Sequence, residues 1–465
     1  MIKERSLRIM VFMKNRTLNM TEGSPVKLLI SFSIPMLIGN IFQQLYNIAD
    51  SMVVGRLVGA EALGAIGATG SITFMFFALC NGIGSGGGII TSQYFGRDDM
   101  GRVKSCIANT AYIMIAFPAV VGVIAFLLAP FLLDLLNTPE AIISDSLSYL
   151  RLMCVGLVFV SLYNYVSSML RALGDSKTPL YFLIFSCILN VGLDLLFVGS
   201  FKMGVTGAAV ATLISQFVSG FFCILYAIRR NPYFKLSRED MVFNTGIISE
   251  VVKIGVPLSL QFSLIAISSM ALQRVVNSFG AIAVAAFTAT SRVEQVIHQP
   301  YQTLSAALST YTGQNFGADK KDRILTGYRK GLMLMVVFSI CMLVVMQFLS
   351  RPITSIFIKE PDVIDMGSTA LKITSLFYIF LGTIYVIRGV LNGLGDGFFA
   401  LYNGIVEVIG RFTVPIMLTS VSFIGLWGIW WSVGIVWFVS GLTAWLRYVF
   451  SGRKILLGTK KPNRS

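Results

Sequence analysis

The residues best suited to chemistry in this sequence are two acids, an amide and a hydroxyl within apolar stretches. Asn190 and Asp194 are four residues apart, so on a helix they share one face. At 1.5 Å per residue, Asp194 and Thr212 lie roughly 9 and 12 Å from the same expected membrane surface, where the helix of Asp50 also ends. Carboxylate, amide and hydroxyl oxygens are hard ligands that suit a small cation or a proton. We therefore predict a site for coupling to Na⁺ or H⁺ at these four residues.

A structural interpretation of the two acids is the alternative. Asp50 is close to a helix end, where a solvated carboxylate needs no function. Asp194 is deeper in an apolar helix. An ionisable residue at such a depth is energetically costly, so a functional role is the first hypothesis for it. Two nearby carboxylates would also raise one another's proton affinity and allow protonation near neutral pH.

The composition is that of a membrane protein. The chain of 465 residues is 55% hydrophobic and 13% charged, whereas soluble domains carry roughly 25% charged residues. The six cysteines have no CxxC spacing, so the sequence predicts neither a disulfide framework nor a zinc site. The sequence GxxxxGK[ST] does not occur, so the chain has no ATP motor of its own. We expect no cofactor, and H⁺ or Na⁺ as the coupling ion.

Apolar stretches predict twelve transmembrane helices, each near or above the roughly 20 residues that cross a bilayer. The fold class is therefore an all-α polytopic membrane protein. The predicted spans are 28–49, 62–95, 105–133, 152–170, 178–201, 203–228, 254–273, 280–316, 331–350, 366–387, 398–421 and 425–446.

The sequence repeats itself at an interval of 221 residues. The run from Gln93 to Asp98 corresponds to Gln314 to Asp319, and Leu173-Gly174-Asp175 corresponds to Leu394-Gly395-Asp396. Six helices per half give both halves the same orientation, so they form parallel repeats about an axis along the membrane normal. Two such repeats predict a central cavity and the architecture of a transporter.

The basic residues predict the topology. With the N-terminus inside, 28 of the 37 Lys and Arg residues lie on the inside and 5 on the outside. This bias explains the net charge of +15 by contact with anionic membrane lipid, so nucleic acid is not an expected partner. We expect a monomeric, multi-pass protein of the bacterial inner membrane with both termini in the cytoplasm.

The same pattern predicts two lobes. The first 24 residues have no apolar core and are expected to form a basic cytoplasmic tail rather than a signal peptide. The predicted segments are the tail at 1–24, the first lobe at 25–230, a linker at 231–252, the second lobe at 253–450 and a second cytoplasmic tail at 451–465.

A second polar group lies in the span 280–316. Glu294 and His298 are four residues apart and share a helix face. His298 is the only histidine, which excludes a multi-histidine metal site, and packing is its simpler interpretation. Glu294 is a candidate to meet a cationic ligand in the central cavity. An ion pair with Arg292 or another basic residue is the alternative.

A third polar pair is Glu407 and Arg411, again four residues apart. Arg411 occupies the repeat position of Asn190, and Pro415 that of Asp194, so the second half lacks the acid of the first. An internal salt bridge is the simplest interpretation of the pair.

With these residues in view, the sequence resembles the MATE (multidrug and toxic compound extrusion) family over about residues 25–450. The resemblance is carried by Pro35, the run from Ala49 to Leu57, the Gln-x-Phe-Gly ends of the second and eighth helices, the two Leu-Gly-Asp turns and Asn190-x-x-x-Asp194. It implies two six-helix lobes and export of small organic cations or amphipathic drugs in exchange for Na⁺ or H⁺.

The resemblance also implies roles for residues. Asp50, Asn190 and Asp194 match the family's N-lobe cation site, and Thr212 matches it by spacing, in the pattern of DinF-like members. Some NorM-like members carry acids on helices 7 and 10, but here Gln261 is near the former position, and 373–387 contains no acid. This difference favours coupling in the first lobe.

The predicted mechanism is alternating access by rocking of the lobes. A cation or proton from outside binds at Asp50 and Asp194 and drives drug release and return of the carrier. Pro35 removes one backbone hydrogen bond from the first helix and allows it to bend.

Three other functions predict different features. A lipid-linked precursor flippase of the same superfamily would favour more helices and a basic cavity. An ion channel does not need two matched halves with one acidic site. A membrane-embedded enzyme needs a nucleophile–base pair or a metal, and the chain offers no acid–histidine cluster beyond Glu294 and His298.

Overall fold

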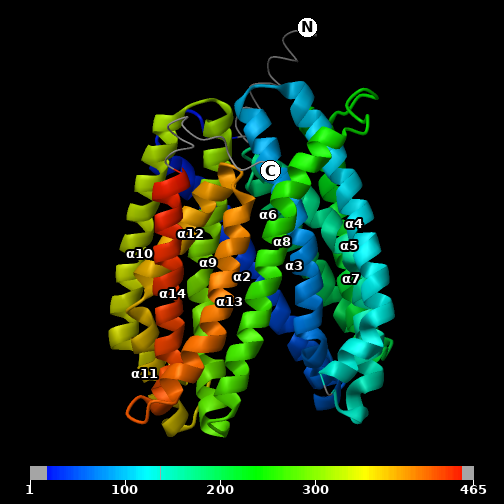
Figure 1. Cartoon of the computed structure of the whole chain (residues 1–465). Helices are drawn as coiled ribbons and strands as arrows, with labels where there is room; N and C mark the ends of the chain where they lie inside the picture. Colours follow the sequence, from blue (N-terminus) through cyan, green and yellow to red (C-terminus); the bar gives the residue numbers. More distant parts are fainter. Residues whose placement is uncertain (1–17, 137, 453–465) are drawn as a thin grey trace. The chain divides into compact units, whose positions relative to one another are not determined.

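The computed structural model describes residues 18–136 and 138–452, and within these ranges every regular element is a helix (Figure 1). Ten of the described helices are long and apolar enough to cross a membrane, or eleven when one bent pair is counted as a span. The all-α membrane fold predicted from the sequence is confirmed. Most of the two predicted tails, at 1–17 and 453–465, lies outside the described residues.

The first half of the chain contributes six of the apolar spans. In order they are α2 (Pro25–Leu57), α3 (Ala60–Gly96), α4 (Met100–Leu135), α5 (Glu140–Ala172), α6 (Lys177–Asp194) continued by the π-helical segment η1 (Leu195–Ser200), and α7 (Gly204–Arg230).

The second half follows a linker that contains the short 3₁₀ helix η2 (Pro232–Phe234). One of its helices, α9, has 37 residues and is long enough to span a membrane, but it is less apolar than the others. In order the helices are α8 (Thr245–Asn277), α9 (Ala281–Gly317), α10 (Lys321–Ser355), α11 (Pro361–Ser375), α12 (Tyr378–Gly393), α13 (Gly397–Thr419), η3 (Gly425–Trp427), α14 (Gly428–Arg447) and η4 (Tyr448–Gly452).

The predicted span 366–387 is two helices rather than one. α11 and α12 form one apolar span that is bent by 53°. At the break, the Phe377 ring packs on Gly434 of α14, where a side chain at Gly434 would overlap the ring. The span also continues to Gly393, so Arg388, which the topology assigned to a cytoplasmic loop, lies within helix α12.

The chain divides into two compact units, and two helices pass from one unit to the other. Of the described residues, the first unit contains 18–20 and those of Ile34–Ser259, and the second contains Thr21–Ser33 and 260–452. The passage therefore occurs inside α2, beside Pro35, and inside α8, two residues after Pro257. These two prolines correspond in the sequence repeat.

The beginning of α8 is fixed to the first unit by close backbone packing. A Cβ atom at Gly82 of α3 would lie 2.2 Å from the backbone nitrogen of Ser259, and one at Gly86 would lie 2.7 Å from that of Gly255. The Ser259 hydroxyl donates to the carbonyl of Leu79 at 2.5 Å. Small residues allow two helices to approach this closely, as they commonly do in membranes.

Each unit has a central span. In the first, α5 packs on α3, α4 and α7, and these helices run side by side in Figure 1. In the second, α12 packs on α9, α10 and α14. Since α5 and the α11–α12 span are the fourth spans of their halves, the packing follows the sequence repeat.

The repeat also extends to the backbone of the turns. Asp98 and Asp319, which correspond in the repeat, have positive φ angles of 58° and 55°. Gly174 and Gly395 correspond in the same way and have φ angles of 87° and 86°. This backbone conformation favours glycine, which accounts for the glycine in both Leu-Gly-Asp turns. The predicted twofold repeat is therefore present in the structure.

Large apolar side chains cover much of the outer surface of the helices. Leu127, Ile188 and Phe348 are 71%, 69% and 80% exposed within the protein. Exposed apolar surface of this extent is unfavourable in water and is expected where a helix faces lipid. The fold is that of a multi-pass membrane protein.

Candidate functional site

The structure brings the four predicted coupling residues together in the first unit. Asn190 and Asp194 project from α6, and Asn190 donates through Nδ2 to the Thr212 hydroxyl of α7 at 3.3 Å. The carboxyl groups of Asp50, on α2, and Asp194 are close enough to interact with each other. Three helices therefore supply two carboxyl groups, an amide and a hydroxyl to one cluster.

Burial is greatest on the α6 side of the cluster. Asp194 is 0% exposed, Asn190 is 1% exposed and Thr212 is 7% exposed, whereas Asp50 is half-buried. Asp194 is the last residue of α6 before the π-helical segment η1. π-Helical turns inside helices occur frequently at functional sites because they change the direction of side chains.

Four buried oxygens of the cluster have no hydrogen-bond donor among the described residues. They are Oδ1 of Asp50, Oδ1 of Asn190 and both carboxyl oxygens of Asp194. A buried carboxylate without donors is strongly unfavourable unless it is protonated or paired with a cation. These oxygen ligands therefore fit a Na⁺ ion, and they equally fit a proton shared between the two acids.

Two tyrosines that the sequence analysis missed also belong to the cluster. The Tyr46 hydroxyl lies 3.4 Å from the Thr212 hydroxyl, and Tyr149 of α5 interacts electrostatically with both acids. Tyr46 precedes Asp50 by four residues, so its helical spacing was a usable signal. Tyr149 has no comparable signal, because its proximity depends on the packing of α5.

In the second unit, Glu294 is not paired with Arg292. Arg292 is exposed on α9, whereas Oε1 of Glu294 is buried and has no donor in the part of the chain that the structure describes. The basic residue that acts on Glu294 is Arg411 of α13, and Thr374 of α11 is a nearby hydroxyl. Neighbouring helices therefore supply the partners of Glu294.

His298 has the environment of a packed aromatic residue. Its ring makes edge contacts with Trp437 at 5.6 Å and with Tyr385 at 6.4 Å between centroids. Among the described residues, no group of three or more His, Cys, Asp and Glu side chains is arranged to hold a metal ion.

The predicted salt bridge between Glu407 and Arg411 is wrong. Glu407 pairs with Arg388 of α12 at 2.8 Å, and Arg411 donates to the Ser269 hydroxyl of α8 at 3.2 Å. Helical spacing allowed the predicted pair, but α12 places a second guanidinium closer to Glu407. Gln261, noted for its position on the seventh predicted helix, lies beside this pair.

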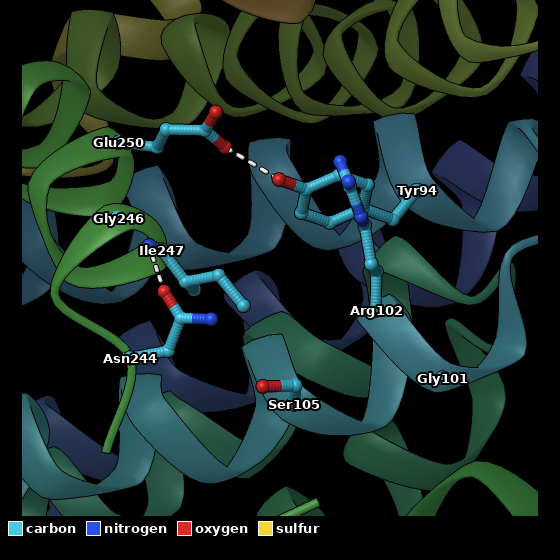
Figure 2. Close-up of a pocket in the computed structure, with 8 residues that line it drawn as sticks. All are labelled: Tyr94, Gly101, Arg102, Ser105, Asn244, Gly246, Ile247 and Glu250. Carbon is cyan, nitrogen blue, oxygen red and sulfur yellow. Dashed lines mark hydrogen bonds between the residues drawn. The ribbon is translucent and has the colours of Figure 1, made fainter. Parts of the chain in front are cut away.

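A cavity of about 350 Å³ in the first unit lies away from the cluster. Figure 2 shows the Tyr94 hydroxyl, which donates to Glu250 at 2.7 Å. Tyr94 is near the end of α3, roughly 50 Å along the helix axis from its start beside α2. The cavity is therefore at the other end of the unit from Asp50. It is lined by Tyr94, Gly101, Arg102, Ser105, Asn244, Gly246, Ile247 and Glu250.

Comparison with known proteins identifies the family. The MatE family model matches the chain in two stretches, residues 35–196 and 257–426, one in each sequence repeat. The chain belongs to the MatE family. The MatE chain is 31% identical over 94% of its length to the Bacillus subtilis protein named "Probable multidrug resistance protein YpnP", of which the match covers 97%. It is 26% identical to "Multidrug export protein MepA" of Staphylococcus saprophyticus, over 93% of this chain and 96% of that protein.

Solved structures show the same fold. A MOP superfamily transporter from Pyrococcus furiosus has a TM-score of 0.87 to the MatE chain, with 22% identity over 95% of this chain and 98% of that one. An outward-facing multidrug resistance MATE family transporter has a TM-score of 0.85, also with 22% identity. The family resemblance predicted from the sequence is confirmed.

Proposed function

We propose that this MatE protein is a secondary active efflux antiporter that exports cationic and amphipathic compounds in exchange for H⁺ or Na⁺. Two kinds of observation support the proposal. Relatives that match over nearly their whole length are named multidrug resistance or export proteins. The observation that supports ion coupling is the proximity of Asp50 and Asp194, three of whose carboxyl oxygens are buried without a donor among the described residues and so favour a proton or a cation.

In this proposal the ion binds between α2 and α6. Asp50 and Asp194 provide the charge, while Asn190 and Thr212 orient the remaining oxygens. Binding removes the repulsion between the two carboxylates and draws α2 toward α6. Pro35 lies on the same helix, so bending of α2 is the step through which ion binding changes drug affinity.

The proposed orientation places both termini in the cytoplasm. Removing the buried Arg388 from the inside count leaves 27 Lys and Arg residues there against 5 outside. The protein then lies in the cell membrane, takes up the ion from outside and releases the drug to the outside. It needs no other cofactor.

The test is efflux of a fluorescent cationic dye from proteoliposomes under a Na⁺ gradient and, separately, under a pH gradient. We expect one gradient to drive export. Asp194→Asn should reduce that export at least ~10-fold, which corresponds to about 1.4 kcal/mol. Asp365→Asn is the matched control, because Asp365 is an exposed acid in the second unit.

Two results would reject the proposal. Full export by Asp194→Asn would show that the acid pair does not couple transport. No export under either gradient would favour a lipid-linked precursor as the substrate, which is the flippase alternative, and lipid translocation would then be measured with the same vesicles.

A further inference from the structure

The second unit contains a buried polar cluster around the guanidinium of Arg388. Arg388 of α12 is 7% exposed and Glu407 of α13 is 5% exposed, while Asn403 of α13 and Gln261 of α8 are 0% exposed. Three helices thus bring one basic, one acidic and two amide side chains together in an apolar unit.

The oxygens of the cluster converge on one cation. Nη2 of Arg388 donates to Oε1 of Glu407 at 2.8 Å and to Oδ1 of Asn403 at 2.5 Å. With its amide oxygen toward the guanidinium, Gln261 accepts from Nε of Arg388 at 2.8 Å. The Tyr385 ring lies 5.7 Å from the guanidinium carbon, within the range of a cation–π contact.

Neighbouring groups hold these oxygens in place. Asn403 donates through Nδ2 to the carbonyl of Ser440 on α14 at 3.2 Å, which directs its oxygen toward Arg388. Gly404 of α13 leaves space for the side chain of Gln261, because a Cβ atom at Gly404 would lie 3.2 Å from Cγ of Gln261. The oxygens are therefore arranged in advance around the position of the cation.

The cluster is absent from the equivalent place in the first unit. Ser167 and Ser186 occupy the repeat positions of Arg388 and Glu407. Where Gln261 meets Gly404 in the second unit, the first unit has the reverse pairing, in which Gly39 adjoins Leu183. The same backbone contact is apolar in one half and lined with oxygens in the other.

The two halves also differ in what their acids face. In the first unit, three carboxyl oxygens of Asp50 and Asp194 are buried without a donor among the described residues, whereas Glu407 in the second unit has a guanidinium of the chain itself. One carboxylate and two amide oxygens around one guanidinium form a charge-balanced shell, which is the chemistry that recognises a small organic monocation.

We propose that the second unit contains a binding site for a guanidinium-type cation, formed by Glu407, Asn403 and Gln261, and that Arg388 permanently occupies it. Arg388 is a positioning residue that joins α8, α12 and α13 through this site. In the intact protein the site takes up no ion from solution. This inference concerns only the second unit and does not depend on the proposed transport function.

The test is chemical replacement of the side chain in purified full-length protein. Arg388→Ala should lower the midpoint of thermal unfolding, and free guanidinium should raise it again by about 4 °C at saturation. Urea has the same shape without the charge and should have no such effect at the same millimolar concentrations. Wild-type protein and Arg351→Ala, which removes an exposed guanidinium of the same unit, should not respond to either compound.

A second variant tests the charge directly. Arg388→Ala combined with Glu407→Gln removes both charges and should fold without responding to guanidinium. If the single variant does not fold and the double variant does, the carboxylate requires a cation and the proposal is supported. An equal response of Arg388→Ala to urea and guanidinium, no response to either, or failure of both variants to fold would overturn it. None of these measurements uses a gradient or a drug, so failure of the antiport proposal would be seen separately.

Discussion

Two salt bridges of the second unit have the same length but different surroundings, and they should contribute very differently to stability. Arg388 and Glu407 lie 2.8 Å apart with side chains 8% and 7% exposed. Arg351 and Asp365 also lie 2.8 Å apart, but their side chains are 65% and 56% exposed. The perturbation is removal of the acid charge from each pair by Glu407→Gln or Asp365→Asn.

The expected magnitudes follow from burial. Removal of one partner from a buried pair leaves the other charge uncompensated and costs about 3–5 kcal/mol. Glutamine retains an acceptor oxygen and Arg388 keeps two amide partners, so we expect the lower end, ~3 kcal/mol, for Glu407→Gln. An exposed pair is screened by solvent and contributes at most about 1 kcal/mol.

The assay is thermal unfolding of the two variants in the same detergent and at the same scan rate. At roughly 2 °C per kcal/mol for a large chain, Glu407→Gln should lower the midpoint by about 6 °C and Asp365→Asn by no more than about 2 °C. Equal shifts for the two variants would refute the reasoning, because they would show that burial does not determine the contribution of the pair.

Three other predictions follow from the contacts of α8 and the linker. Gly86→Val should destabilise the protein by about 1–3 kcal/mol, measured by thermal unfolding, because the added side chain overlaps the backbone of α8. Pro257→Ala restores a backbone donor to α8, and if bending there serves transport it should slow dye export without lowering the unfolding midpoint; unchanged export would contradict this. Burial opposes ionisation of Asp240, but hydrogen bonds from Ser237 and the charge of Lys104 lower its pKa. The stabilisation that a lowered pKa provides is present at any pH above about 4 and is lost as the pH falls through the folded value. The protection factors of the linker amides, which are exchange rates corrected for the intrinsic rate at each pH, should therefore stay constant from neutral pH to about pH 5. A loss of protection already at pH 6 would contradict this assignment.

Most of the fold was predictable because the two halves of the sequence are repeats of each other. Apolar length identifies spans, and correspondence between halves identifies turns, such as those at Gly174 and Gly395. The break between α11 and α12 was not predictable, because neither residue at the break, Leu376 or Phe377, is a glycine or a proline. That bend depends on the contact of Phe377 with α14, which is tertiary.

The acid cluster of the first unit was predictable, whereas the guanidinium cluster of the second was not. Asp194 stands out because a charge inside an apolar stretch has few structural explanations. Arg388 follows a span of predicted length and so was counted among the loop residues that face lipid headgroups. Its burial becomes visible only when α13 supplies Glu407 and Asn403.

Under the antiport proposal, the two clusters together explain how a repeated backbone can couple transport through one half only. Repetition of helices and turns gives both halves the same packing, but Asp194 of the first half is matched by Pro415 in the second. The second-half acids Glu407 and Glu294 face the guanidinium groups of Arg388 and Arg411. A carboxylate that is already paired with a fixed cation has no electrostatic reason to take up another. Under the antiport proposal, ion uptake should therefore follow the titration of the first unit alone, and Glu407→Gln should leave the ion dependence of export unchanged while Asp194→Asn removes it. Loss of ion dependence in Glu407→Gln, in protein that remains folded, would show that the second half takes part in coupling.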